Sequence, residues 1–308
     1  MKFTAAFTAF CIAAVQVSGS ALPKRGAAAP TDVQVLNFAL TLEYLENAFY
    51  SQGLAKHSEA DFEKAGLPSW VRGRFEQIAK HEATHVSFLK TALGEGNAVE
   101  PCTYDFNDNS VKDFVDFSGM VETVGTSAYT GAAQLIGDKD YLTAAASILA
   151  TEARQTAWVN SAVRGGAPWS TSFETPLDVN QIYTIASSVI TSCPSGNAKL
   201  LPPTIAAFPS LTIPADAMPG KTVKLAYKPA KGASKSAKKY VAFISGLDTV
   251  FVPLGSSGEV EIPKDLYGVV FAVVTTNGTM VDDKVTVAGP AFLNFGFGSD
   301  GGPEAFKI

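Results

Sequence analysis

The amino-acid sequence predicts two structural parts in one chain, a four-helix bundle with a short fifth helix and then a β-sandwich. Apolar residues recur at spacings of three and four from residue 31 to about residue 192, as on the buried face of a helix. From residue 202 onward, short β-type runs recur roughly ten residues apart, with turn signals between them. A chain of 308 residues that is 46% hydrophobic and 17% charged can bury a core in each part.

The helical part is expected to span residues 31–195. Thr31 is a good N-cap for the first helix, and Gly94 and Gly96 follow the end of the second. The five helical segments are expected near residues 31–53, 69–93, 111–136, 141–163 and 179–191.

The β part is expected to span residues 202–308. Pro202 and Pro203 open a region that is rich in proline, glycine, valine and threonine. Its short runs of β-forming residues are predicted strands at 223–227, 240–245, 250–253, 259–262, 269–275 and 284–287. Their even spacing is typical of an Ig-like β-sandwich.

The N-terminus has the features of a secretory signal peptide. Lys2 precedes an apolar run that ends in small residues, so we expect a signal peptide at 1–21 and a short segment at 22–30. Lys24-Arg25 is either a dibasic processing site or two exposed charges. No later run is apolar enough for a membrane helix, so no membrane span is expected. The net charge of -5 argues against a nucleic-acid partner.

Two cysteines and one N-glycosylation sequon are consistent with secretion of the protein. Cys102 and Cys193 remain after the signal, and they form either a disulfide, the favoured prediction, or two buried thiols. Asn277 begins an N-x-S/T sequon on a turn between predicted strands and is a predicted glycosylation site. The expected location is secreted, extracellular or in a cell wall.

Each of the four long helices places one glutamate in the middle of its apolar stripe. These residues are Glu43, Glu82, Glu122 and Glu152. A buried, unpaired carboxylate costs several kcal/mol or becomes protonated. Either cations neutralise the four carboxylates, or some of them face water; their matching depth in four helices favours cations.

The spacing of Glu82 and His85 suits a metal ion, because residues three apart lie on adjacent turns of one helix face. Oxygen-rich donor sets with a little imidazole favour iron or manganese. The predicted metal ligands are Glu43, Glu82, His85, Glu122 and Glu152. Glutamates from four helices with Glu-x-x-His motifs are the donor pattern of di-iron and di-manganese bundles.

Several segments carry a family resemblance. Leu36-Asn37, Glu43 and Tyr50 resemble the first helix of bacterioferritins, and Glu82-Ala83-Thr84-His85 resembles their second-helix ligand motif. Glu152-Ala153-Arg154-Gln155 resembles the fourth-helix motif, with Gln155 where histidine is expected. The segment LNFALTLEYLENAFY resembles secreted fungal ferritin-like proteins described as stress-response, desiccation-related or late sexual development proteins. The resemblance implies a ferritin-like bundle linked to stress or sexual development.

Gln155 departs from the expected set of metal ligands, because an amide oxygen is a poor metal ligand. The centre could therefore hold one ion or none. Glu46 is either an extra ligand or a partner for Arg154 or Lys80. Tyr129 lies on the ligand face and is expected to hydrogen-bond a ligand carboxylate. Tyr50 is expected to be a packing residue.

Two functions remain open. The first is a metal-binding protein and, if it is an enzyme, a di-iron oxidase or a peroxide-consuming oxidoreductase. The second is a structural protein on a degenerate scaffold whose β part binds cell-wall polysaccharide or another protein. A G-x-S-x-G hydrolase motif is absent from the sequence.

Overall fold

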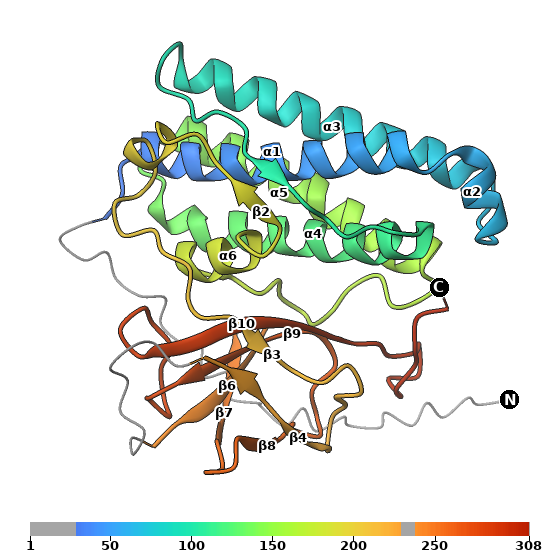
Figure 1. Ribbon diagram of the computed structural model, residues 1–308, viewed down its shortest axis with the longest axis vertical. Coiled ribbons are helices and arrows are strands. Elements are labelled where there is room, and N and C mark those ends of the chain that lie inside the picture. Colours follow the sequence, from blue (N-terminus) through green and yellow to red (C-terminus); the bar gives the residue numbers. More distant parts are fainter. Residues whose placement is uncertain (1–28, 229–237, 308) are drawn as a thin grey trace, which may run out of the picture.

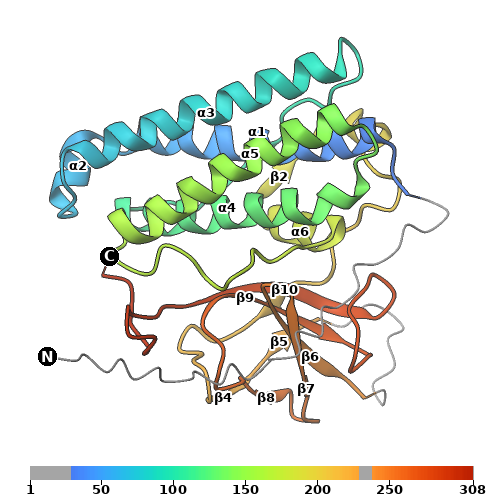
Figure 2. The ribbon, with the colours of Figure 1, turned by 180° about the vertical axis from the view of Figure 1, so that it is seen from behind.

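The computed structural model describes residues 29–228 and 238–307. The expected signal peptide and most of the segment at 22–30 lie outside the described residues. A layer of helices lies against a β region (Figure 1). The same two layers are seen from behind in Figure 2, where the C-terminal end of the chain lies near the end of α5.

Four long helices form the helical layer, as the periodicity predicted. They are α1 (Asp32–Lys56), α3 (Trp70–Leu93), α4 (Val111–Ala132) and α5 (Lys139–Trp158). Thr31 caps α1 through a reciprocal capping box with Gln34. Ser110 caps α4, and Asp138 caps α5. α1 packs along α3, α4 packs along α5, and α1 contacts α4.

Shorter elements complete this layer. α2 (Glu59–Lys64) and α6 (Val179–Ala186) are helices, a 3-10 turn (Ala133–Leu135) follows α4, and a π-helical turn (Val159–Val163) follows α5. The sequence did not predict α2.

The fifth helix was predicted too long. α6 ends at Ala186, and β2 (Ile190–Ser192) pairs antiparallel with β1 (Thr103–Tyr104). The predicted disulfide is present between Cys102 and Cys193, directly beside this pair. A cross-link next to two short segments favours pairing between them over a further helical turn.

The β region contains a four-stranded antiparallel sheet in the order β10-β9-β6-β7. The strands are β6 (Tyr240–Ser245), β7 (Asp248–Pro253), β9 (Gly268–Thr275) and β10 (Thr286–Phe295). Two short antiparallel pairs accompany it: β3 (Leu211–Thr212) with β5 (Ala226–Tyr227), and β4 (Thr222–Lys224) with β8 (Glu259–Glu261). A 3-10 turn (Asn197–Lys199) precedes them in the chain. The helical part and the β part are therefore both present, while an Ig-like sandwich stays a prediction.

The central strands are buried on both faces because a layer covers each side of the sheet. Successive side chains of a strand point to opposite faces. Ile244, Phe271 and Val273 belong to the core that the sheet shares with the helices. Phe243 and Val270 pack with Leu211 and the short pairs on the other side. The four-stranded sheet is thus the middle layer, between the helices and the short pairs.

Asn277 lies half-buried in the segment after β9, where its side-chain oxygen accepts hydrogen bonds from the backbone and hydroxyl of Thr279. Its glycosylation stays a prediction. No helix in the described ranges has the length and apolarity that a membrane crossing requires.

Candidate metal centre

Five glutamates are buried between the four long helices. Glu43 and Glu46 come from α1, Glu82 from α3, Glu122 from α4 and Glu152 from α5. Glu46 is 3% exposed, and the other four are 0% exposed. In α3, α4 and α5 the apolar face turns into the core, and the glutamate on that face is buried with it. α1 is buried on nearly all sides, so both of its glutamates lie in the core.

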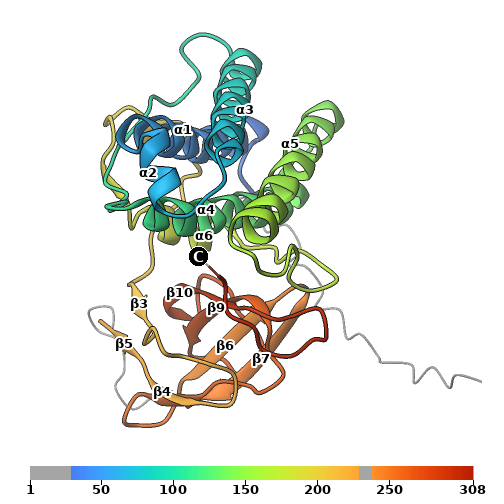
Figure 3. The same ribbon diagram turned by 90° about the vertical axis from the view of Figure 1, so that its right-hand side faces the viewer.

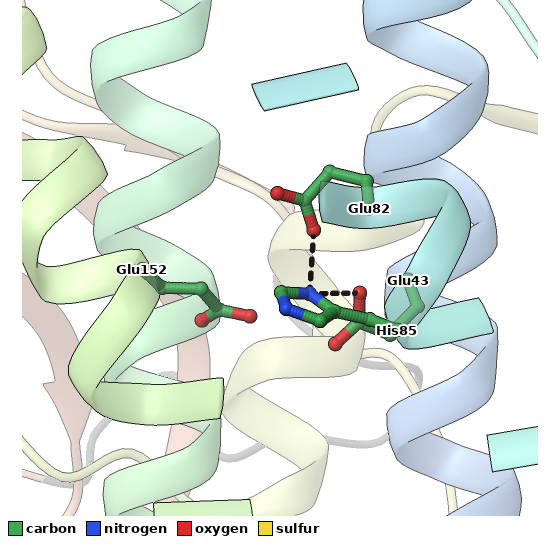
Figure 4. A group of neighbouring side chains, drawn as sticks. All are labelled: Glu43, Glu82, His85 and Glu152. Carbon is green, nitrogen blue, oxygen red and sulfur yellow. Dashed lines mark hydrogen bonds and ion pairs between the residues drawn. The ribbon is translucent and has the colours of Figure 1, made fainter. Parts of the chain in front are cut away.

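Four of the predicted ligands form one compact group. Glu43, Glu82, His85 and Glu152 each offer one ligand atom, and these atoms all lie within 4.8 Å of one another. Figure 4 shows Glu152 reaching from α5 toward the other three residues. His85 Nδ1 lies 2.9 Å from Glu82 Oε2 and 3.2 Å from Glu43 Oε2. This spacing suits one cation that replaces the proton shared by these atoms.

Glu122 is not a member of this compact group. The hydroxyl of Tyr50 donates a hydrogen bond to Glu122 Oε1, and Glu122 Oε2 is buried with no partner among the described residues. Tyr50 is therefore more than the packing residue that the sequence suggested. Tyr129 holds Glu43 in the same way, because its hydroxyl donates a hydrogen bond to Glu43 Oε1 at 2.5 Å.

Gly125 provides the space for two of the carboxylates, and sequence reasoning missed it. A Cβ atom at this position of α4 would lie 2.7 Å from both Glu152 Oε2 and Glu46 Oε1. Glycine inside a helix costs roughly 1 kcal/mol relative to alanine, so this position calls for a reason. Its place three residues after Glu122, on the same helix face, is the signal that could have identified it.

Gln155 occupies the position where the resemblance led us to expect histidine. Its Nε2 atom donates to Glu82 Oε1 at 2.8 Å and lies 3.4 Å from His81 Nδ1. Its Oε1 atom is buried with no partner in the described parts of the chain. The amide thus holds Glu82 in place and leaves one neutral oxygen free beside the carboxylates.

The buried charges change the proton affinity of the cluster. Burial raises the pKa of Glu43 to about 7, although its hydrogen bond to His85 opposes the shift. Burial and the neighbouring carboxylates raise the pKa values of Glu46, Glu122 and Glu152. Burial alone would lower the pKa of His85, but its hydrogen bonds to Glu43 and Glu82 outweigh burial and raise it to about 10. Without a cation, the cluster therefore binds protons.

The donor set fits a metal ion. Both carboxylate oxygens of Glu152 are buried and lack a hydrogen-bond partner among the described residues, as does Glu122 Oε2. Native structures leave few buried polar atoms unpaired, and a bound cation would pair these oxygens. Carboxylates with one imidazole are the donors that iron and manganese accept.

Two comparisons with known proteins bear on this cluster. A family model described as ferritin-like domain matches residues 31–165. Protein rds1 of Schizosaccharomyces pombe is 28% identical over 272 residues, a match that covers 74% of this chain and 66% of the relative's own length. Residues 31–165, which the family model matches, contain all five buried glutamates and His85. Residues 31–165 therefore form a ferritin-like domain.

Proposed function

We propose that this chain is a secreted fungal metal-binding protein whose ferritin-like domain holds iron or manganese at a two-ion carboxylate centre. One observation carries the proposal. Glu152 places two buried oxygens, both without a partner among the described residues, in a cluster where three carboxylates and one imidazole approach within 4.8 Å. A domain cannot keep such a group ionised at low cost unless a cation compensates it.

The residues divide between the two ion positions. Glu43, Glu82, His85 and Glu152 would hold the first ion. Glu46 and Glu122 would hold the second ion, because Glu46 shares the space over Gly125 with Glu152, and Glu122 Oε2 has no partner in the described ranges. Gln155 contacts Glu82 Oε1, whereas His85 contacts Glu82 Oε2, so Gln155 would be the counterpart of His85 for the second ion. It offers only an amide oxygen, so the second ion should bind more weakly than the first.

The protein's own residues orient the donors and exclude water. Tyr50 and Tyr129 hold Glu122 and Glu43 by their hydroxyl groups, and Gln155 holds Glu82. Bound iron would supply one-electron chemistry with dioxygen or peroxide, the basis for an oxidase or a peroxide-consuming oxidoreductase. Such chemistry at the cell surface would suit a role in stress or development.

Export is part of the proposal. The signal-like N-terminus, the sequon at Asn277 and the disulfide between Cys102 and Cys193 all support an oxidising, extracellular location. The second candidate function is a structural protein with a degenerate centre, whose β region binds cell-wall polysaccharide or protein. Glutamine at position 155, where the family resemblance leads us to expect a histidine ligand, favours this second candidate.

Metal analysis of the purified protein tests the proposal. After anaerobic loading with Fe²⁺ or Mn²⁺, we expect one tightly held ion per chain and a second that is lost first on dialysis. The variant Gln155→His should tighten the second ion by roughly ten-fold or more, because imidazole replaces a weak amide donor. Gln52→His adds an imidazole to an exposed position of α1 and should change nothing. If neither the wild type nor Gln155→His retains an ion while both stay folded, the metal proposal is wrong.

A further inference from the structure

A groove runs along the outer side of the helical layer, between α3 and α5. Figure 3 looks along the helices and shows these two helices standing apart, whereas α1 lies close beside α3. The groove has a volume of about 850 Å³, and all the residues that line it come from α3 and α5. That volume lies within the range of roughly 300–1,000 Å³ that is typical of sites for small molecules.

The charge of the groove is positive. Two arginines, Arg74 and Arg154, line it, and no acidic residue is among its lining residues in the described chain. Arg154 is exposed and makes no hydrogen bond or ion pair with another described residue, while Arg74 donates only to Gln77. The chain as a whole has a net charge of -5, so a concave surface with only basic ionisable residues is a local exception. Such a surface concentrates anions.

Aromatic rings form one end of the groove. Trp70, which is 48% exposed, and Trp158 lie with their ring centroids 6.2 Å apart. Arg154 and Trp158 are four residues apart on α5, so they are neighbours on one helix face. An acid group bound to Arg154 would therefore bring an attached planar ring toward Trp158.

The floor of the groove reaches the carboxylate cluster. His85 and Gln155 line the groove, and both contact Glu82. Gln155 is 5% exposed, and its Oε1 atom has no partner among the described residues. The floor thus combines an unused hydrogen-bond acceptor with direct contact to the proposed metal ligands.

We propose that this groove binds a small aromatic carboxylate, with its acid group on Arg154 and its ring against Trp158 and Trp70. A guanidinium matches a carboxylate with two parallel hydrogen bonds, and the indole faces supply apolar contact for a ring. The groove is too large for a bare inorganic anion to fill. The proposal goes beyond metal binding and does not depend on it, because none of the three named contacts is a metal ligand.

The test uses the metal-free full-length secreted protein and two matched probes, 2-naphthoate and its neutral analogue 2-naphthamide, in calorimetric titrations. The wild type should bind 2-naphthoate about ten-fold more tightly than 2-naphthamide. Arg154→Gln should remove this preference and leave the binding of 2-naphthamide unchanged. Trp70→Ala, at an exposed position, should weaken both probes. The matched control is Lys80→Gln, which removes an exposed charge of α3 outside the groove and should have no effect.

Three results would overturn the proposal. Equal affinities of the wild type for both probes would show that the groove does not select an acid group. An equal loss of 2-naphthoate binding in Arg154→Gln and Lys80→Gln would show that binding depends on the net charge of the protein and not on a contact with Arg154. Self-association of the wild type that Arg154→Gln abolishes would show that a second copy of the chain occupies the groove.

Discussion

Replacing Glu152 with methionine is expected to stabilise the metal-free protein and to abolish its stabilisation by Mn²⁺. Both oxygens of this carboxylate are buried without a partner among the described residues, and its pKa is raised by burial and by Glu43 and Glu82. An apolar side chain of similar length removes this cost, which should add about 1–3 kcal/mol to the free energy of unfolding near neutral pH. The wild type should instead gain roughly 3–4 kcal/mol at Mn²⁺ concentrations of 100 to 1,000 times its dissociation constant.

Urea denaturation with and without Mn²⁺ measures both effects in one set of curves. Glu95→Met is the matched control, because Glu95 is exposed in the turn after α3 and should alter neither the metal-free stability nor the gain from Mn²⁺. A metal-free Glu152→Met protein that is less stable than the wild type would mean that the carboxylate is already compensated. In that case, the unpartnered oxygens would lose their value as evidence for a cation.

The centre was predictable as far as helical periodicity reaches. Glu43, Glu82, Glu122 and Glu152 could be assigned to the core because each lies within the apolar stripe of its own helix, and this argument needs no other helix. It did not decide the place of Glu46, which the structure buries beside them. The contacts of Tyr50 and Gly125 were not predictable in this way. They depend on how close α1 and α4 lie, and on which side chains meet across that distance.

The β region shows the same limit. The predicted run 223–227 is split in the structure, because β4 pairs with β8 and β5 pairs with β3. The predicted strand 269–275 forms most of β9. All eight residues of β9 are buried, so no alternation of apolar and polar residues indicates which face of the strand packs against which layer. The packing of the helices against this sheet is a tertiary property that no local pattern specifies.

The stability of the metal-free protein is expected to fall as the pH rises from about 5 to about 10. The pKa of Glu43 is raised from 4.5 to about 7, and those of Glu46, Glu122 and Glu152 are raised as well. The folded state thus keeps protons that the unfolded chain releases, so this stabilisation is complete below pH 4.5 and is lost as the pH rises through the folded pKa values.

His85 acts in the same direction. Its pKa is raised from 6.5 to about 10, so its contribution is complete below pH 6.5 and is lost as the pH rises toward 10. A bound cation reverses the trend, because it takes the place of protons and its affinity therefore increases with pH. The difference in stability between metal-bound and metal-free protein should widen as the solution becomes more basic.

Urea midpoints at about pH 5.5 and about pH 8, each with and without Mn²⁺, provide the measurement. Glu43→Gln should flatten the fall of the metal-free protein, because it removes one of the groups that release a proton. Glu95→Gln, which changes an exposed carboxylate, should leave the slope as in the wild type. A metal-free protein whose stability stays constant or rises between these pH values would show that the cluster is ionised without a cation, and the argument for a metal would then lose its electrostatic basis.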